Sequence, residues 1–253
     1  MFDKHFEVVL ADSEEAKRIH YKIRYQVYCI ESGYEDHRAF ADGEEKDEWD
    51  HQSAHFAVRS KETGEWIAAM RLILPGNHNE QPVFRLCDID TTVSDKTRYS
   101  KTGEISRLCI ISPYRCKPLP TRSEMNLHAE SSSLPHQRDR CKEPLIVLGL
   151  FRAAVQYSRE HNIPYWYFLT TPALARILKR MHVNLIKAGG GCQHNGERHP
   201  FLVDLRDAVA RARRGSAIIA QILGNKVGYI RYSQLLNEAG QASEPLYLQT
   251  YAA

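Results

Sequence analysis

The sequence lacks long apolar runs and the short signatures of several protein classes. No stretch approaches the roughly 18 apolar residues needed to cross a bilayer. Residues 1–7 carry acids where a secretory signal has a basic and then an apolar region. The six cysteines stand singly, without a C-x-x-C pair, which indicates reduced, mostly buried thiols in a cytoplasmic protein.

The sequence also lacks the signatures of several kinds of catalytic and binding site. There is no G-x-S-x-G elbow, and Ser106 has no adjacent histidine, so a serine nucleophile is not indicated. The glycines at 189–191 follow a predicted strand but open no helix, so they do not predict a phosphate cradle. Cys192, His194 and His199 lack a fourth zinc ligand, and we predict no metal site.

Charge is present in quantity but is unevenly distributed. Residues 1–50 hold 14 acids and 7 Lys or Arg, whereas the remainder holds 17 acids and 27 Lys or Arg. This division predicts an acidic and a basic surface with separate tasks. No basic stripe interleaved with aromatic residues occurs, so nucleic acid is not an expected partner, whereas an acidic protein suits the basic part.

The 253 residues are enough for one large domain with a proper core. Hydrophobic periodicity predicts strands at 6–11, 54–60, 66–74, 104–111, 165–169, 183–187 and 201–205. It predicts helices at 13–29, 144–161, about 172–181, and from 207 onward. Segments 75–103 and 112–144 lack periodicity, and loops of this length are more often functional than inert. The order predicts an α/β (α+β) three-layer domain with a mixed sheet.

The first candidate site is a group of carboxylates at residues 45–50. Glu45, Asp47 and Asp50 surround Trp49 within six positions. They form either a solvated acidic loop or a pocket wall, and Trp49 favours the pocket because its large ring tends to be buried. In a pocket, such carboxylates would hold an ammonium group through charge-assisted hydrogen bonds.

The second candidate site is Glu104-Ile105-Ser106-Arg107. On a strand, Glu104 and Ser106 share one face. A glutamate opening an apolar strand is either ion-paired or a general base. Arg24 and Arg71 interrupt apolar segments elsewhere, so we expect them to pair with the acidic loop, as structural salt bridges or as part of a site.

Four motifs in order resemble a known family. Arg24-x-x-Val27-Tyr28, Glu45-x-Asp47-x-Trp49-Asp50, Arg71-Leu72-x-x-Pro75 and Glu104-x-Ser106-Arg107 have the order and spacing of the acyl-homoserine-lactone synthases. The pattern over residues 6–205 is more similar still to the N-acyl amino acid synthases and the acyltransferases associated with PEP-CTERM/exosortase systems. All of these belong to the GCN5-related N-acyltransferase (GNAT) superfamily.

The resemblance implies a GNAT-like fold over residues 1–205 with a splayed, mixed central sheet, followed by a helical extension over residues 206–253 packed on the same domain. The thioester donor would lie between the parting strands 104–111 and 165–169. Glu104 would be the general base, with Ser106 also catalytic and backbone N–H groups near Leu108 stabilising the oxyanion. The residues implied in acceptor binding are Arg24, Asp47, Trp49, Asp50, Arg71 and Arg107.

The resemblance also implies an acyl-phosphopantetheine thioester, carried by acyl carrier protein rather than by CoA, as donor substrate, with no permanently bound cofactor. The long 112–144 segment supports this, because CoA-using relatives have a glycine-rich pyrophosphate turn there. Bases that suit an acidic carrier, or that are ordinary solvated surface, are Arg138, Arg140, Lys142 and Arg152. Residues that would line the acyl channel, or simply pack in the core, are Leu108, Leu148, Phe151, Trp166 and Phe168.

The sequence therefore predicts a cytoplasmic N-acyltransferase that joins a fatty acyl chain to an amino acid or similar small amine, with peripheral membrane contact through its lipid product. Tyr34 stands where acyl-homoserine-lactone synthases usually have Trp, and the tail after residue 206 is longer than theirs, which favours the amino-acid branch. An acyl-homoserine-lactone synthase using S-adenosylmethionine is the nearest alternative. A non-catalytic module that binds acyl carrier protein or lipid is the second.

Overall fold

A single open sheet organises the chain. The computed structural model describes residues 2–76, 81–90, 93, 101–116, 141–180, 182–224 and 227–239. Within them, nine strands form a mixed sheet in the order β6-β8-β5-β4-β3-β2-β1-β9, with β7 paired to β8. The predicted mixed sheet with flanking helices is confirmed.

The element bounds follow the chain. The strands are β1 (Phe6–Leu10), β2 (Ser53–Ser60), β3 (Trp66–Ile73), β4 (Thr102–Ile110), β5 (Tyr165–Thr170), β6 (Ile186–Lys187), β7 (Cys192–Gln193), β8 (Glu197–Asp204) and β9 (Ile230–Arg231). The α-helices are α1 (Phe2–His5), α2 (Glu14–Tyr25), α3 (Pro82–Leu86), α6 (Glu143–Glu160), α7 (Pro172–Arg180), α8 (Leu205–Gly215), α9 (Ala217–Gly224) and α10 (Tyr232–Ala239).

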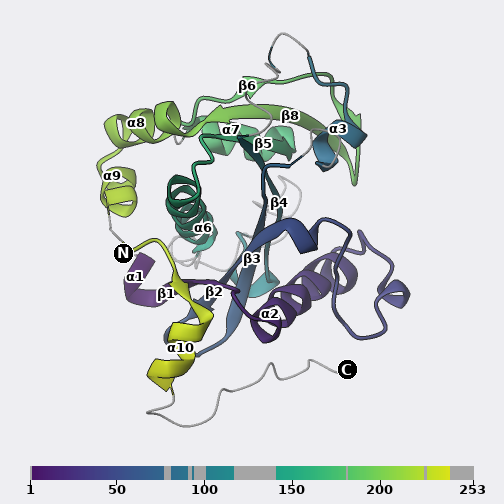
Figure 1. The fold of residues 1–253 in the computed structure, drawn as a ribbon, viewed down its shortest axis with the longest axis vertical. Helices are drawn as coiled ribbons and strands as arrows, with labels where there is room; N and C mark the ends of the chain where they lie inside the picture. Colours follow the sequence, from purple (N-terminus) through teal and green to yellow (C-terminus); the bar gives the residue numbers. More distant parts are fainter. Residues whose placement is uncertain are drawn as a thin grey trace, which may run out of the picture.

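Two helices cover opposite faces of the central strands. Figure 1 shows β2, β3 and β4 running between α6 on one side and α2 on the other. Side chains of β5 alternate accordingly, because successive residues of a strand point to opposite faces. Trp166 donates through Nε1 to Ser158 of α6 at 2.9 Å, whereas the Tyr167 ring packs on Phe84 of α3, at 5.2 Å between centroids. The α3 helix therefore lies on the face away from α6.

The sheet opens between β4 and β5. These parallel strands pair from Thr102 with Tyr165 to Ile105 with Phe168, and the pairing then stops although both strands continue. Arg107 has a φ of 52°, in the left-handed region, and the register of β4 against β3 shifts beside it. Such a bulge bends one strand away from its neighbour. The expected splay of the sheet is confirmed.

The central elements agree with the sequence to within a few residues, but others differ. The predicted strand 183–187 is reduced to β6, and β8 begins four residues before the predicted strand 201–205. Ser13 caps α2 by accepting the N–H of Ala16 at 3.2 Å. The helix changes to a π-helix over Gln26–Glu31. The segment after residue 206, expected to be helical, also contributes β9, which pairs in parallel with β1.

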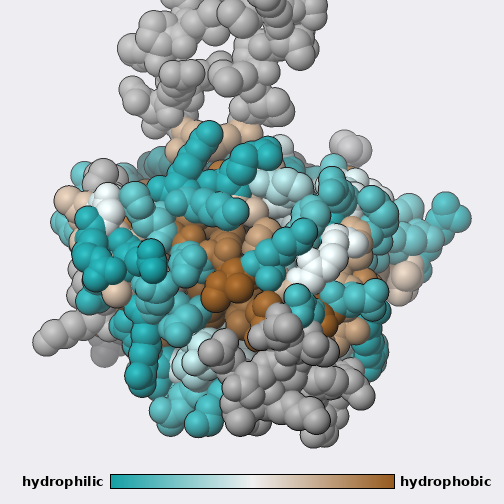
Figure 2. Space-filling model, turned by 90° about the horizontal axis from the view of Figure 1, so that it is seen from above, coloured by the Kyte–Doolittle hydropathy of each residue, from teal (hydrophilic) through white to brown (hydrophobic). Residues whose placement is uncertain are grey.

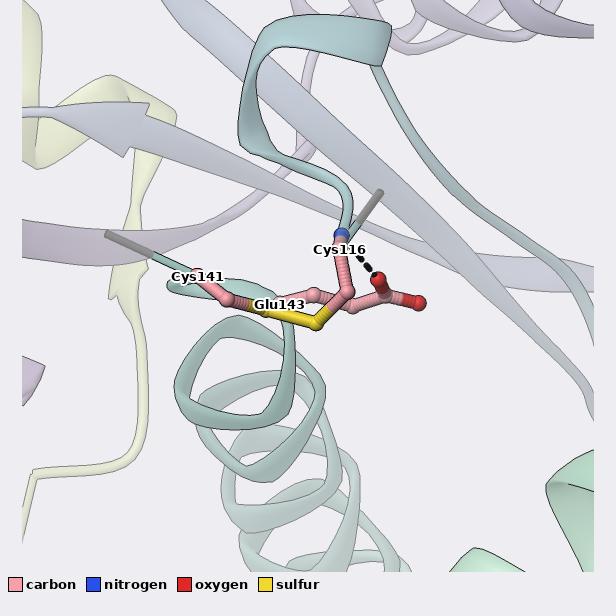
Figure 3. Close-up of side chains that lie close together, drawn as sticks. All are labelled: Cys116, Cys141 and Glu143. Atoms are coloured by element: carbon pink, nitrogen blue, oxygen red, sulfur yellow. Dashed lines mark hydrogen bonds between the residues drawn. A yellow bond between two sulfur atoms is a disulfide. The ribbon is translucent and has the colours of Figure 1, made fainter. Parts of the chain in front are cut away.

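The cysteine prediction needs correction. Cys116 and Cys141 form a disulfide with a Cα–Cα distance of 5.1 Å, so not all thiols are reduced (Figure 3). The two ends of the 112–144 segment meet here, and Glu143 accepts the N–H of Cys116 at 2.6 Å. This geometry was not apparent from the sequence, because the two residues lie 25 positions apart in an aperiodic stretch. In the part of the chain that the structure describes, no helix is long and apolar enough to span a membrane.

Candidate active site

A cluster of three arginines and three carboxylates lies beside β3 and β4. Arg24 of α2 donates through Nε to Glu45 at 2.5 Å and through Nη1 to Asp50 at 2.6 Å. Arg71 of β3 donates to Asp50 at 2.7 Å and to both carboxylate oxygens of Asp47. The predicted pairing of the two arginines with the acidic loop is confirmed.

The β4 motif joins the same cluster. Arg71 Nε donates to Ser106 Oγ at 3.1 Å, which links β3 to the Glu104-x-Ser106-Arg107 motif of β4. Arg107 Nη2 lies 3.2 Å from Glu45 and 3.0 Å from Asp47. Residues from four separate segments therefore meet at one place, as the order of the motifs implied.

Exposure divides this cluster into two groups. Arg24 and Arg71 are fully buried, and Asp50 is only 5% exposed. They were predicted to bind the acceptor, and their side chains are covered and contact carboxylates of the cluster. The reachable members are Asp47, at 16% side-chain exposure, and Arg107, at 21%. Among the buried members, Arg71 holds Asp47, and Arg24 holds Glu45, which in turn contacts Arg107.

Trp49 stands at the rim of the cluster. It is half-buried, and the Arg85 guanidinium lies over its ring at 5.0 Å from the centroid. This stacking is a cation–π contact of the usual geometry. The carboxylate loop is thus a wall of the cluster and not a freely solvated segment.

His55 is a member of the cluster that the sequence did not reveal. Its Nε2 contacts Asp50 Oδ1 at 3.0 Å, so three positively polarised groups converge on that carboxylate. Burial by itself would raise the pKa of Asp50, but the His55 hydrogen bond and the charges of Arg24 and Arg71 outweigh it and hold the pKa well below its usual range. The sequence did contain one indication of this role, because His55 is a polar residue within the predicted apolar strand 54–60.

Glu104 is the carboxylate with a pKa near neutrality. It is 2% exposed, and one of its oxygens accepts the N–H of Val83 in α3 at 3.0 Å. Burial raises its pKa to about 7, against the opposing effects of the Val83 hydrogen bond and the charges of Arg71 and Arg107. A group with such a pKa can take and return a proton at neutral pH.

Backbone groups at the bulge of β4 complete the polar site. Arg107 and Leu108 have no residue opposite them in the β3 register. The Leu108 carbonyl accepts the hydroxyl of Tyr28 at 3.1 Å, and Arg107 lies over the same ring. The bulge thus places strand backbone at the point where β4 leaves β5.

An apolar cavity of about 60 Å³ lies on the other face of the sheet. It is lined only by apolar residues of α6, β5, β8, α8 and their neighbours, and these include the predicted Leu148, Phe151, Trp166 and Phe168. Leu108, also predicted for the channel, is not among the lining residues and packs against the main core. Figure 2 views the molecule from the side of β6 and β8, and shows an apolar area surrounded by hydrophilic side chains.

The bases expected to contact a carrier protein are placed differently. Arg152 is 4% exposed and forms an ion pair with Asp3, with Nη2 2.5 Å from the carboxylate, so it offers no surface for docking. Its position on an inward-facing turn of α6 explains the error. Lys142 is half-buried over the Phe6 ring, 5.5 Å from its centroid. Arg138 and Arg140 lie outside the described residues.

Comparison with known proteins identifies the class. Residues 23–123 match the family described as acetyltransferase (GNAT) domain, a stretch that contains the whole charged cluster. Residues 23–123 are thus similar to a GNAT acetyltransferase domain, and this similarity indicates an N-acyltransferase enzyme. No curated protein sequence matches it.

Solved structures share the fold at low identity. BjaI, a CoA-dependent acyl-homoserine lactone synthase solved with SAM and isopentyl-CoA, is 13% identical with a TM-score of 0.56, over 90% of this chain and 92% of BjaI. TofI, solved with an inhibitor and MTA, is 17% identical with a TM-score of 0.52, over 84% of this chain and 99% of TofI. FeeM, an N-acyl amino acid synthase from uncultured soil microbes, is 12% identical with a TM-score of 0.50, over 81% of this chain and 93% of FeeM.

Proposed function

We propose that the protein transfers a fatty acyl chain from a phosphopantetheine thioester to the amine of an amino acid or similar small metabolite, with Glu104 as general base. One observation carries the proposal. A buried carboxyl group with a pKa of about 7, that of Glu104, lies one residue before the last pair of β4 with β5 and on the same strand as Ser106 and Arg107 of the charged cluster.

The two faces of the sheet suit the two halves of the reaction. Glu104 receives its hydrogen bond from α3, on the face away from α6. The apolar cavity lies on the α6 face, where Phe151 packs on Trp166. A thioester carbonyl in the gap between β4 and β5 would have its apolar chain on one face and the acceptor amine on the other.

The chemistry needs a base more than an acid. A thiol has a pKa near 8.5 and leaves readily as thiolate, whereas an α-amine with a pKa of about 8 is largely protonated at neutral pH. Glu104 would accept the amine proton through one water, because its carboxylate is itself covered. The Leu108 region of the bulge would supply backbone N–H groups to the oxyanion.

The acceptor would bind to the reachable part of the cluster. Asp47 suits an ammonium group, and Arg107 suits a carboxylate, so the pair fits the two charges of an amino acid. S-adenosylmethionine also has both groups, and BjaI was solved with it, so a lactone product is the second candidate. Tyr34, which is 48% exposed near Tyr28, is the residue that departs from the usual tryptophan of the lactone synthases.

An acyl carrier protein is the donor that the surface charge favours. Helix α7 contains three exposed bases and no acid: Arg176, Lys179 and Arg180. The same helix contributes Leu178 to the apolar cavity. An acidic carrier held by these bases would present its thioester chain close to the cavity, a role first expected of Arg152.

The test is a comparison of Glu104→Gln with Glu62→Gln. Glu62 is exposed in the turn between β2 and β3, and its change should have no effect. Glu104→Gln should lower thiol release from an acyl thioester, in the presence of the acceptor, by at least about tenfold while the fold is retained. Undiminished turnover would remove Glu104 from the mechanism. Mass spectrometry of lipid extracts from cells overexpressing the protein would then distinguish an N-acyl amino acid from a lactone.

A further inference from the structure

Two thiols far apart in the sequence meet beside the helix that covers Glu104. Cys87 caps the C-terminal end of α3, and Cys192 opens β7. Their sulfur atoms are 2.8 Å apart, inside the contact distance of two non-bonded sulfurs. The other free cysteines among the described residues, Cys29 and Cys109, are both buried.

The backbone holds these two segments together independently of the sulfurs. Asp90 donates its N–H to the carbonyl of Ala188 at 2.7 Å, and Gly190 donates to the carbonyl of Asp88 at 3.3 Å. A Cβ atom on Gly189 would lie 2.1 Å from the Asp88 carbonyl oxygen, so this close approach requires glycine. Bond formation between the two sulfurs therefore needs only a small local movement.

We propose that Cys87 and Cys192 are a reversible disulfide site that fastens α3 to the β7–β8 hairpin. The Val83 amide that binds Glu104 belongs to the same short helix. A disulfide at its end would fix the helix over the Glu104 carboxylate. The redox state of the two cysteines would thus decide whether α3 is covalently attached above that carboxylate. This proposal does not depend on the acyl-transfer function.

The exchange chemistry assigns different roles to the two thiols. Cys192 is half-exposed, and Cys87 is buried, with its pKa raised to about 12 by that burial. The Cys192 thiolate attacks a small disulfide such as oxidised glutathione, which forms a mixed disulfide and releases one glutathione thiol. Cys87, once deprotonated, attacks the Cys192 sulfur and releases the second. Two protein thiols are oxidised and one glutathione disulfide is reduced to two thiols.

The experiment equilibrates the full chain in defined mixtures of oxidised and reduced glutathione, blocks remaining thiols under denaturing conditions, and maps peptides by mass spectrometry. We expect the Cys87 and Cys192 peptides to be linked in oxidising mixtures, while Cys29 and Cys109 are alkylated. In the native protein, trypsin cleavage after Arg85 within α3 should be slower in the oxidised form.

Two variants make the test decisive. Cys192→Ser should abolish both the linkage and the slower cleavage, whereas Cys109→Ser should preserve both. Separate alkylation of Cys87 and Cys192 in fully oxidised glutathione would overturn the proposal. Protection of both thiols by added zinc, reversed by a chelator and without linked peptides, would also overturn it and assign a metal pair instead.

Discussion

At the scale of single residues, Glu104 has opposite effects on activity and on stability. Its pKa is raised from 4.5 to about 7, so the folded state favours the protonated form. The stability that the protonated Glu104 contributes to the folded state is fully present below about pH 4.5. It is lost as the pH rises through 7. Above pH 7 the ionised carboxylate is a buried charge that lowers the free energy of unfolding by at most about 3 kcal/mol.

We therefore expect Glu104→Gln to melt at a higher temperature than the unchanged protein at pH 8, by a few degrees, and not at pH 4.5. Thermal unfolding at the two pH values measures this, with Glu62→Gln as the exposed control. For the unchanged protein, kcat should rise with pH through about 7, as base catalysis requires. An equal melting shift at both pH values would contradict the assigned pKa.

Arg71 should matter more for stability than any surface ion pair. It is fully buried and donates to two carboxylates and Ser106, so Arg71→Ala leaves each of these covered carboxylates with one positive partner fewer. We expect a loss of about 3–5 kcal/mol in the free energy of unfolding by urea. Lys46→Ala removes an exposed pair with Asp42 at 2.8 Å and should cost less than about 1 kcal/mol. Similar losses for the two variants would refute the positioning role.

The sequence predicted which charged residues meet, but not how deeply each is buried. Arginines within apolar segments require carboxylates, and this rule correctly joined Arg24 and Arg71 to the acidic loop. Burial depends on what covers the cluster from distant segments, as α3 covers Glu104. For the same reason His55 was missed, because its partner Asp50 is apparent only once the loop is folded against β2.

At the scale of elements, strong hydrophobic periodicity predicted the helices and strands near the core. The segments without periodicity gave no prediction of secondary structure. The predicted strand 54–60 and helix 144–161 agree with β2 and α6 to within a residue. The two-residue β9 and the short α3 have too few residues to show a period. They form because they pair with or pack on neighbouring elements, as β9 does on β1 and α3 on β5. A local sequence pattern contains no information about such contacts.

The cavity between α6 and α8 should set the acyl chain length. Its volume is only about 60 Å³, so each added methylene of a bound chain changes the fit. Ala212 of α8 lines it, and Ala212→Leu should shift the preferred donor to shorter chains. Ala210 is exposed on the same helix, so Ala210→Leu should change nothing. Turnover of thioesters of graded length checks this, and an unchanged preference would place the chain elsewhere.

At the scale of the whole molecule, the charge asymmetry makes a prediction about the donor. Lys179 and Arg180 are exposed at the end of α7, and charge reversal of both should raise the KM for an acyl carrier protein donor several-fold. The KM for the matching acyl-CoA should change little. Reversal of Arg18 and Lys22, two exposed bases of α2, is the control. Equal effects on both donors would argue against carrier docking at α7.

The pairing of β9 with β1 has a consequence for handling the protein. Val9 and Leu10 meet Ile230 and Arg231, so the tail occupies hydrogen-bonding groups on the outer side of β1. A shortened chain ending at residue 224 would leave β1 as an unpaired edge strand of the sheet. Unpaired edge strands can form hydrogen bonds with strands of other molecules. Such a truncation should self-associate during purification, which makes the C-terminal segment a guard against aggregation.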